Sequence, residues 1–254
     1  MERKKPVKGD SIAVWFSCGA ASAVAAKKTL ELYRDCDVTI LNSPIAEEDD
    51  DNRRFLSDVE KWLNKEIKIV KSDKYVSQSA VEVWETKRFM SSIAGAPCTV
   101  ELKKYPRQNY EQENKVDWNV LGFTVEEKNR AERFMLTERD NLLPVLINEN
   151  ISKVTCMEII NSAGISLPRV YKMGYPNANC IGCVKATSPT YWNLVRKTHP
   201  SVFDHRAKQS RDIGVKLTRV NGERIFLDEL DPNAFGEAIK DHLYECGLFC
   251  EENN

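Results

Sequence analysis

Residues 11–30 read SIAVWFSCGAASAVAAKKTL, and this stretch decides the fold. The apolar run at 12–16 predicts a short buried strand, and the small residues at 17–22 predict a tight turn into an alanine-rich helix. Such a turn brings backbone N–H groups and the positive end of a helix together, and only small side chains let a phosphate approach them. The same pattern is also typical of an ordinary tight strand–helix turn. Its position as the first such turn of the chain favours phosphate binding.

The turn also resembles a known phosphate loop. Phosphoadenosine-phosphosulfate (PAPS) and adenylyl-sulfate (APS) reductases usually carry Ser-Phe-Gly-small-x-Ser/Ala-Ala-Val, and the chain here carries Ser17, Cys18, Gly19, Ala20, Ala21 and Ser22. These reductases belong to the PP-loop group of adenine-nucleotide enzymes, whose ATP-cleaving members have Ser-Gly-Gly-x-Asp-Ser instead. Ala21 stands at the position of that aspartate. The resemblance therefore favours the reductase branch, and it implies an adenine nucleotide as ligand, namely PAPS, APS or ATP.

Composition and charge limit the other classes. A chain of 254 residues with 42% hydrophobic residues can form one large domain, or a domain with a smaller appendage. Its net charge of −1 predicts no general attraction to nucleic acid, although a locally basic groove is compatible with it. The charged start MERKKPVKGD and the lack of a long apolar run predict a cytoplasmic protein without a membrane partner. In a reducing compartment, the 8 cysteines are expected to be metal ligands or reactive thiols.

The order of the predicted elements indicates an α/β fold. Strands are expected at 37–42, 67–70, 116–123 and 144–147, and they alternate with helices at 52–64, 76–86, 124–136 and 152–162. This alternation predicts a Rossmann-like, mostly parallel sheet. After residue 164 the chain becomes rich in Gly, Pro and Asn. Short helices at 191–197 and 202–211 and a hairpin around Asn221-Gly222 follow.

The resemblance refines this to the HUP/PP-loop type of sheet with a cysteine-rich C-terminal cap. We expect a nucleotide-binding domain over 1–150 and the cap over 151–254.

Cys180 and Cys183 give the strongest metal signal. Two thiolates three positions apart, with Gly182 between them, are able to bind one metal centre. A redox dithiol has the same spacing, but it normally opens a helix in a thioredoxin-like unit. Iron–sulfur clusters and zinc accept the same thiolates, and a site without metal stays open as well.

Cys98, in the stretch PCTVELKKYP, extends the resemblance. In the iron–sulfur branch of APS/PAPS reductases, a Cys-Cys pair, a basic stretch and a proline precede a distant C-x-x-C. Here the pair is Pro97-Cys98, so one of the usual ligands is missing. The fourth ligand is then Cys250, Cys156 or Cys246. Alternatively, one iron has no protein ligand and is open to a small molecule, as in iron–sulfur tRNA thiolases of the PP-loop group. We expect a 4Fe–4S cluster held by Cys98, Cys180, Cys183 and Cys250, with zinc as the alternative.

The C-terminal Glu245-Cys246-Gly247-Leu248 resembles the Glu-Cys-Gly-Ile/Leu-His of the reductases, with Phe249 in place of the histidine. In that family the cysteine attacks the sulfur of the bound sulfonucleotide. The resemblance thus implies that Cys246 is the catalytic nucleophile and that a thioredoxin-like or other thiol is the electron donor. A tail with two incidental thiols is the alternative.

Residues 121–130, LGFTVEEKNR, are a second candidate for anion binding. They resemble the reductase element Thr-Gly-x-Arg-x-(Asp/Glu)-x-x-x-x-Arg, which implies that Gly122, Arg130 and Arg133 hold substrate phosphate or sulfate. Thr124 and Glu127 have the spacing of a capping box. The alternative is a solvated helix in which Glu126 pairs with Arg130.

Two charged stretches complete the set. The acidic residues 47–51 are expected to cap the following helix or to bind Mg²⁺. The basic residues near the cysteines are compatible with binding a sulfonucleotide or a thiolate; they are Lys103, Lys104, Arg107 and Lys185.

The leading prediction is therefore a PAPS/APS-reductase-like enzyme that forms sulfite from a sulfonucleotide by thiol attack. One alternative is an iron–sulfur sulfurtransferase that uses ATP and acts on nucleic acid, of the tRNA-thiolation or DNA-phosphorothioation type; Ala21 counts against it. The other is a non-catalytic nucleotide-binding module, suggested by Phe249.

Overall fold

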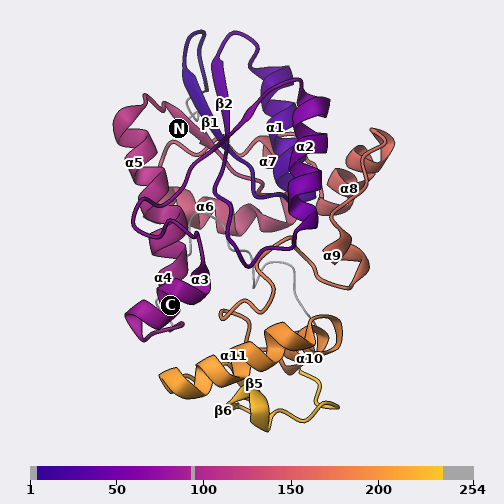
Figure 1. Ribbon diagram of the computed structural model, residues 1–254. Helices are drawn as coiled ribbons and strands as arrows, with labels where there is room; N and C mark the ends of the chain where they lie inside the picture. Colours follow the sequence, from indigo (N-terminus) through magenta and orange to yellow (C-terminus); the bar gives the residue numbers. More distant parts are fainter. Residues whose placement is uncertain (1–4, 93–94, 237–254) are drawn as a thin grey trace. The chain divides into compact units, whose positions relative to one another are not determined.

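The structure is a computed structural model that describes residues 5–92 and 95–236 (Figure 1). The chain folds into two units, each assembled from segments that are distant in sequence. The first unit comprises Met1–Pro44, Asp50–Val70 and Arg107–Pro168, and the second comprises Ile45–Asp49, Lys71–Pro106 and Arg169–Asn254. The expected domains, 1–150 and 151–254, describe a division by function and stay a prediction.

Within the described ranges, the first unit holds a four-stranded parallel sheet in the order β3-β2-β1-β4. Its strands are β1 (Ser11–Trp15), β2 (Asp37–Asn42), β3 (Ile67–Ile69) and β4 (Trp118–Val120). The chain runs from β1 outward to β2 and β3, and then returns to pair β4 with the other side of β1. The α/β class and the parallel sheet are confirmed, and the order is consistent with a Rossmann-like fold.

Helices cover both faces of this sheet. Successive strand residues point to opposite faces, so Ile12 and Val14 join the apolar core formed with α1, α2, α7 and α8, whereas Trp15 meets Tyr110 of α5 with 6.1 Å between ring centroids. Figure 1 shows α1 and α2 on one side of the strands and α5 on the other. The helical elements of this unit are α1 (Ala20–Leu32), α2 (Asp51–Leu63), α5 (Tyr105–Glu113), the 3₁₀ turn η2 (Val125–Glu127), α6 (Lys128–Thr137), α7 (Val145–Asn148) and α8 (Lys153–Ser162).

The second unit is mainly helical and has a core of its own. Trp84, Trp192, Tyr175 and Phe203 are among its large buried side chains. Its elements are α3 (Ala80–Lys87), α4 (Pro97–Thr99), the π-helical turn η1 (Val100–Lys104), α9 (Arg169–Lys172), α10 (Pro189–Thr198), α11 (Pro200–Ile213), the antiparallel hairpin of β5 (Thr218–Val220) and β6 (Glu223–Ile225), and the 3₁₀ turn η3 (Leu227–Glu229).

Two sequence expectations fail here. Residues 144–147 were expected to form a strand, but this apolar run begins helix α7, and the parallel pairing with β4 is a single bridge from Asn119 to Leu142. Apolar runs this short do not distinguish a strand from a helix. No element was predicted after Cys98, yet the chain is helical from Pro97 to Glu113. Pro106 lies inside this continuous helical run, directly after the π-helical turn η1.

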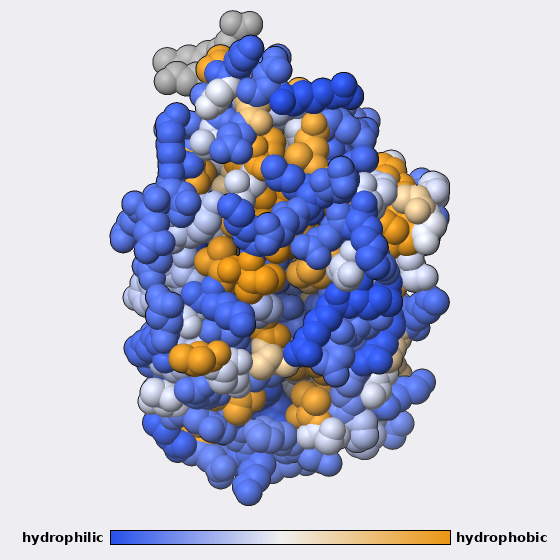
Figure 2. Space-filling model, turned by 45° about the horizontal axis from the view of Figure 1, so that its top comes forward, coloured by the Kyte–Doolittle hydropathy of each residue, from blue (hydrophilic) through white to orange (hydrophobic). Residues whose placement is uncertain are grey.

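The described surface is largely polar. On the face drawn in Figure 2, hydrophilic residues predominate and apolar residues form separate patches. Of the helices that the structure describes, none combines the length and the apolar character needed to cross a membrane.

Candidate functional site

The loop after β1 is organised by the hydroxyl of Ser22. This buried oxygen accepts hydrogen bonds from Ser17 N at 3.1 Å and from Ser17 Oγ at 3.2 Å, and it donates to Gly19 O at 3.0 Å. One donor and two acceptor sites are all that a hydroxyl has. Ser22 therefore braces the loop, and Ser17, whose hydroxyl donates to it, is exposed.

Cys18 adopts an unusual backbone conformation that this brace helps to hold. Its φ of 58° lies in the left-handed region, which non-glycine residues rarely adopt. Asn42, the last residue of β2, is buried and donates through Nδ2 to Phe16 O at 2.8 Å and to Cys18 Sγ at 3.6 Å. Asn42 thus ties the end of β2 to the bend of the loop. It was not among the predicted site residues, and its only signal in the sequence is a polar residue closing the apolar run VTIL.

The loop after β4 packs directly on the loop after β1. At Gly122 a side chain is impossible without movement of the backbone, because a Cβ atom would lie 2.8 Å from Ser22 N and 3.0 Å from Ser22 Cα. The structure therefore brings Gly122 together with residues 17–22, as expected. These two loops leave neighbouring parallel strands at the point where the chain connections reverse direction, which is where open α/β sheets bind their ligands.

Arg130 is held beside the second of these loops. Thr124 and Glu127 form the predicted capping box at the start of η2. Glu127 also binds Arg130, with 2.7 Å between carboxylate oxygen and Nη1, and the guanidinium lies 5.1 Å from the centroid of the Phe123 ring. Glu127 is thus a partner of Arg130 within the same turn. Arg133, one turn further along α6, is exposed.

The start of α1 suits a negative ligand. Gly19 is the N-cap, no side chain caps the described helix end, and no acidic residue lies in the first turn. The peptide dipoles of a helix give this end a partial positive charge. Ala20 and Ala21 have small side chains, which is the residue type that phosphate-binding helix starts require, although Ala20 itself is buried.

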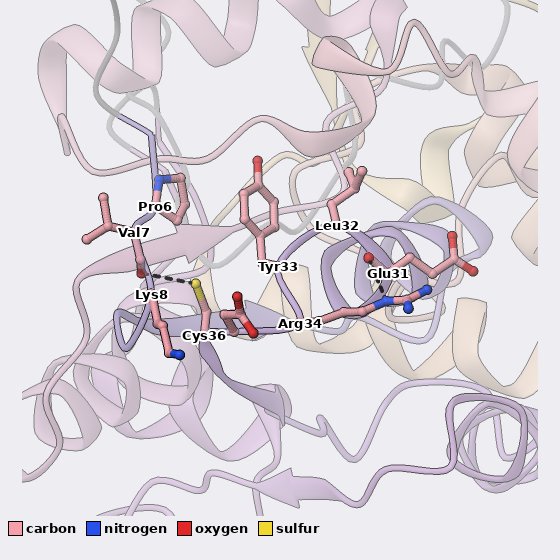
Figure 3. Close-up of a pocket in the computed structure, with 9 residues that line it drawn as sticks. Pro6, Val7, Lys8, Glu31, Leu32, Tyr33, Arg34 and Cys36 are labelled. Carbon is pink, nitrogen blue, oxygen red and sulfur yellow. Dashed lines mark hydrogen bonds between the residues drawn. The ribbon is translucent and has the colours of Figure 1, made fainter.

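A surface pocket of about 380 Å³ lies at the opposite, amino edge of the sheet (Figure 3). It is formed by the segment before β1 and by the end of α1, and Cys36 Sγ donates there to Val7 O at 3.3 Å. Charged side chains of Lys8, Glu31 and Arg34 surround it. None of its lining residues belongs to the two loops just described, so this pocket is not the candidate nucleotide site.

Cys180 and Cys183 lie in the second unit on a tight, buried loop. Gly182 between them has a φ of +70°, and a Cβ atom there would lie 3.0 Å from Val202 Cγ1, so this position requires glycine. The hydroxyl of Tyr191 accepts a hydrogen bond from Cys183 N at 2.9 Å and lies 3.5 Å from Cys180 O. Burial raises the pKa of Tyr191 well above its ordinary value, so its phenol stays protonated.

A buried arginine lies beneath this loop. Arg206 is 2% exposed and donates from Nε to Gly182 O at 3.2 Å. It also donates from Nη1 to Gln209 Oε1. Its guanidinium stacks on Trp84, with 4.2 Å between the guanidinium carbon and the ring centroid. Burial lowers the pKa of Arg206, while Glu47 and both cysteines act in the opposite direction. Among the described residues, no carboxylate lies within ion-pair distance of this guanidinium. The buried cation thus contacts the backbone between the two cysteines.

The third predicted metal ligand belongs to the same unit. Cys98 is half-buried in α4 and packs against the core that contains Cys180 and Cys183. Across residues 5–92 and 95–236, no three His, Cys, Asp or Glu side chains are grouped closely enough to hold a metal ion. Cys246 and Cys250 lie outside the described residues. Cys156, a possible further ligand, is fully buried in the apolar core of the first unit.

The acidic run is distributed among protein partners. Glu47 accepts from Ser79 Oγ, Ala80 N and Val81 N, and so caps α3 rather than the helix that follows the run.

Further along the run, Asp49 pairs with Arg169 at 2.8 Å, and Glu48 pairs with the buried Lys103 at 3.6 Å. Glu47, Glu48 and Asp49 thus each have a protein partner within the second unit.

Comparison with known proteins adds no further information. No family model matches the chain, and a search of curated proteins gives no match. The resemblance to PAPS/APS reductases therefore depends on the motifs themselves.

Proposed function

We propose that the protein binds the phosphates of an adenine nucleotide between the loops that follow β1 and β4. The observation that carries this proposal is the contact of Gly122 with the backbone of Ser22 at the point where the sheet topology reverses. Both loops present backbone rather than bulky side chains there, and Arg130 supplies a cation beside the second loop. On this basis we interpret the sheet as the HUP/PP-loop type and residues 151–254 as its cysteine-rich cap.

The motifs support a sulfonucleotide, APS or PAPS, as the substrate. In the proposed reaction, the thiolate of Cys246 attacks the sulfate sulfur and forms an S–S bond. The bond between sulfur and the phosphate oxygen breaks, and AMP or adenosine 3′,5′-bisphosphate leaves with the electron pair. A dithiol donor of the thioredoxin class then attacks the Cys246 sulfur, releases sulfite, and is itself oxidised to a disulfide. Such thiols persist in a reducing compartment such as the cytoplasm.

The cysteine loop supports a thiolate-bound group in the second unit. The buried Arg206 offers the positive charge that an anionic thiolate centre needs, so Cys180 and Cys183 fit as a ligand pair, with Cys98 and Cys250 as the further candidates. A 4Fe–4S cluster there would supply an iron centre bound by these thiolates; zinc would hold the same thiolates. The protein residues would orient the centre and exclude water from it, since both cysteines are buried.

Calorimetry with AMP, adenosine 3′,5′-bisphosphate and ATP tests the nucleotide site. Gly122→Val should abolish binding, because its side chain displaces the Ser22 backbone from the loop. Ala163→Val, which also introduces a valine but at an exposed helix end, is the control and should bind like the wild type. Unchanged affinity in a folded Gly122→Val would refute the site.

Anaerobic turnover tests the chemistry separately. The wild type should release sulfite from APS or PAPS in the presence of a dithiol. Cys246→Ser should bind nucleotide without forming sulfite, because a serine hydroxyl is not a nucleophile at neutral pH in the absence of a base. Sulfite formation by Cys246→Ser would exclude the mechanism.

A further inference from the structure

A group of cations surrounds Phe226 in the second unit. The guanidinium carbon of Arg211 lies 3.9 Å from the ring centroid, and Nζ of Lys216 lies 5.6 Å from it. Arg224 donates from Nη1 to Lys216 O at 3.2 Å. Arg219 is directly opposite Arg224 in the register of the β5–β6 hairpin. We call these four residues, Arg211, Lys216, Arg219 and Arg224, the hairpin cluster.

Acidic partners neutralise only one member of the hairpin cluster. Arg211 binds Asp228 at 2.8 Å and Glu229 at 2.7 Å. In the part of the chain that the structure describes, the other three members form no ion pair. The residues Arg219 and Arg224 are exposed, and like charges directly opposite each other destabilise a β-ribbon. The hairpin therefore retains a repulsion that a bound polyanion would relieve.

We propose that the hairpin cluster binds the phosphate backbone of a nucleic acid. Arginine is suited to this ligand, because its planar guanidinium donates two parallel hydrogen bonds to one phosphate. Two arginines on neighbouring strands present a pair of such donors side by side. The surface is local, and the net charge of −1 for the whole chain conceals it.

A membrane surface is a poorer fit to the same charges. The turn between the strands is Asn221-Gly222, followed by Glu223, so the tip of the ribbon has no large apolar side chain to insert into lipid. Phe226 is enclosed by Arg211 and Lys216 and does not project as an anchor.

The hairpin is also joined to the segment that follows the cysteine loop. Arg219 N donates to Thr187 O at 2.9 Å, and Thr218 Oγ1 donates to the same carbonyl at 3.1 Å. Thr187 comes four residues after Cys183. The hairpin and the buried thiols thus belong to the same unit and are joined through Thr187. A nucleic acid bound to the hairpin would be held by that unit. This proposal does not depend on the nucleotide site between the loops after β1 and β4.

Fluorescence anisotropy with the full chain tests the proposal, using a labelled RNA hairpin and a labelled duplex DNA over a range of salt concentrations. We expect the wild type to bind at least one probe, with affinity that falls as salt rises. The double variant Arg219→Gln/Arg224→Gln should weaken binding about tenfold or more and reduce the slope of log affinity against log salt by about 2. Its melting temperature should not fall, because the substitutions remove a repulsion.

The matched control is Lys172→Gln/Lys197→Gln, which removes two exposed cations that make none of the contacts of the hairpin cluster. It should bind RNA or DNA like the wild type. Equal weakening by the control would overturn the proposal, as would absence of binding to both probes. Equally effective competition by a polyglutamate peptide or by anionic vesicles would overturn it as well. Retained AMP binding in the hairpin variant would show that the nucleotide site is a separate property.

Discussion

Buried cysteines occur in both units, and their surroundings differ. In the first unit, Cys156 is fully buried between apolar side chains, and burial raises the pKa of its thiol to about 12. In the second unit, Cys180 and Cys183 are nearly as buried, but they flank a carbonyl that binds Arg206. A thiol among apolar groups stays protonated, whereas a nearby cation favours the thiolate. Burial alone therefore does not identify a structural cysteine; the charge of its neighbours does.

Removing one thiol from each unit should give the largest contrast. Protein purified without oxygen should be brown and contain iron and sulfide, and Cys180→Ser should lose both because a thiolate ligand is gone. Cys156→Ser should keep them, since this residue belongs to the apolar core of the other unit. Metal analysis and absorbance spectra provide the measurement. If the wild type is colourless and contains zinc, the metal is zinc rather than iron, and the predicted ligands stay the same. Equal metal loss in Cys180→Ser and Cys156→Ser would refute the contrast between the two units.

The second-largest effect should come from removing the positive charge of Arg206 beneath the cysteine loop. Arg206→Gln removes the cation but keeps a hydrogen-bond donor for Gly182 O, and we expect metal to be lost to a chelator at about tenfold lower chelator concentration. Arg206→Lys preserves the charge and should restore most of the retention. Competition titrations with a coloured chelator measure this. Identical retention in all three proteins would show that Arg206 only fills space against Trp84.

The two regions also differ in how far the sequence predicts them. The strand, small-residue turn and helix of residues 11–32 follow from local patterns, and so does the hairpin at Asn221-Gly222, because a turn is determined mainly by its own residues. The spacing of Cys180 and Cys183 likewise predicts a tight loop. Arg206 gives no such signal, since its contact with Gly182 joins positions 24 residues apart on different elements.

Long-range contacts explain the other omissions. The bond from Asn42 to the loop after β1 depends on the pairing of β1 with β2, which a single polar residue at a strand end does not reveal. The apolar run at 144–147 was assigned as a strand from its composition, and only its packing in the core with α1 and α8 makes it a helix. Sequence patterns thus predict a candidate site, and tertiary contacts determine which side chains brace it.

Asn42→Ala tests the brace of the first unit. The variant leaves Phe16 O without its partner and Cys18 without support for its left-handed conformation. We expect about 2 kcal/mol lower unfolding free energy and weaker AMP binding. Urea denaturation and calorimetry measure the two effects. Thr39→Ala, a polar deletion in the middle of the same strand, is the control and should retain AMP affinity. Unchanged nucleotide affinity in Asn42→Ala would show that the hydrogen bonds of Asn42 do not contribute to nucleotide binding.

The last effect concerns Cys156 and appears only in alkaline solution. Burial, the main cause, raises the pKa of this thiol from 9.0 to about 12. Below pH 9 the thiol is protonated in both the folded and the unfolded chain, so it makes no pH-dependent contribution. Above pH 9 the unfolded chain loses the proton while the folded chain keeps it, and the folded state therefore becomes less stable by about 1.4 kcal/mol for each pH unit.

Cys156→Ala has no thiol to ionise, so the difference in unfolding free energy between wild type and variant should shrink as pH rises from 9 towards 12. All other titrating groups are shared by the two proteins and cancel in this difference. A difference that is independent of pH over this interval would mean that the Cys156 thiol ionises alike in both states. The apolar surroundings of the first unit would then not distinguish its cysteine from those of the second.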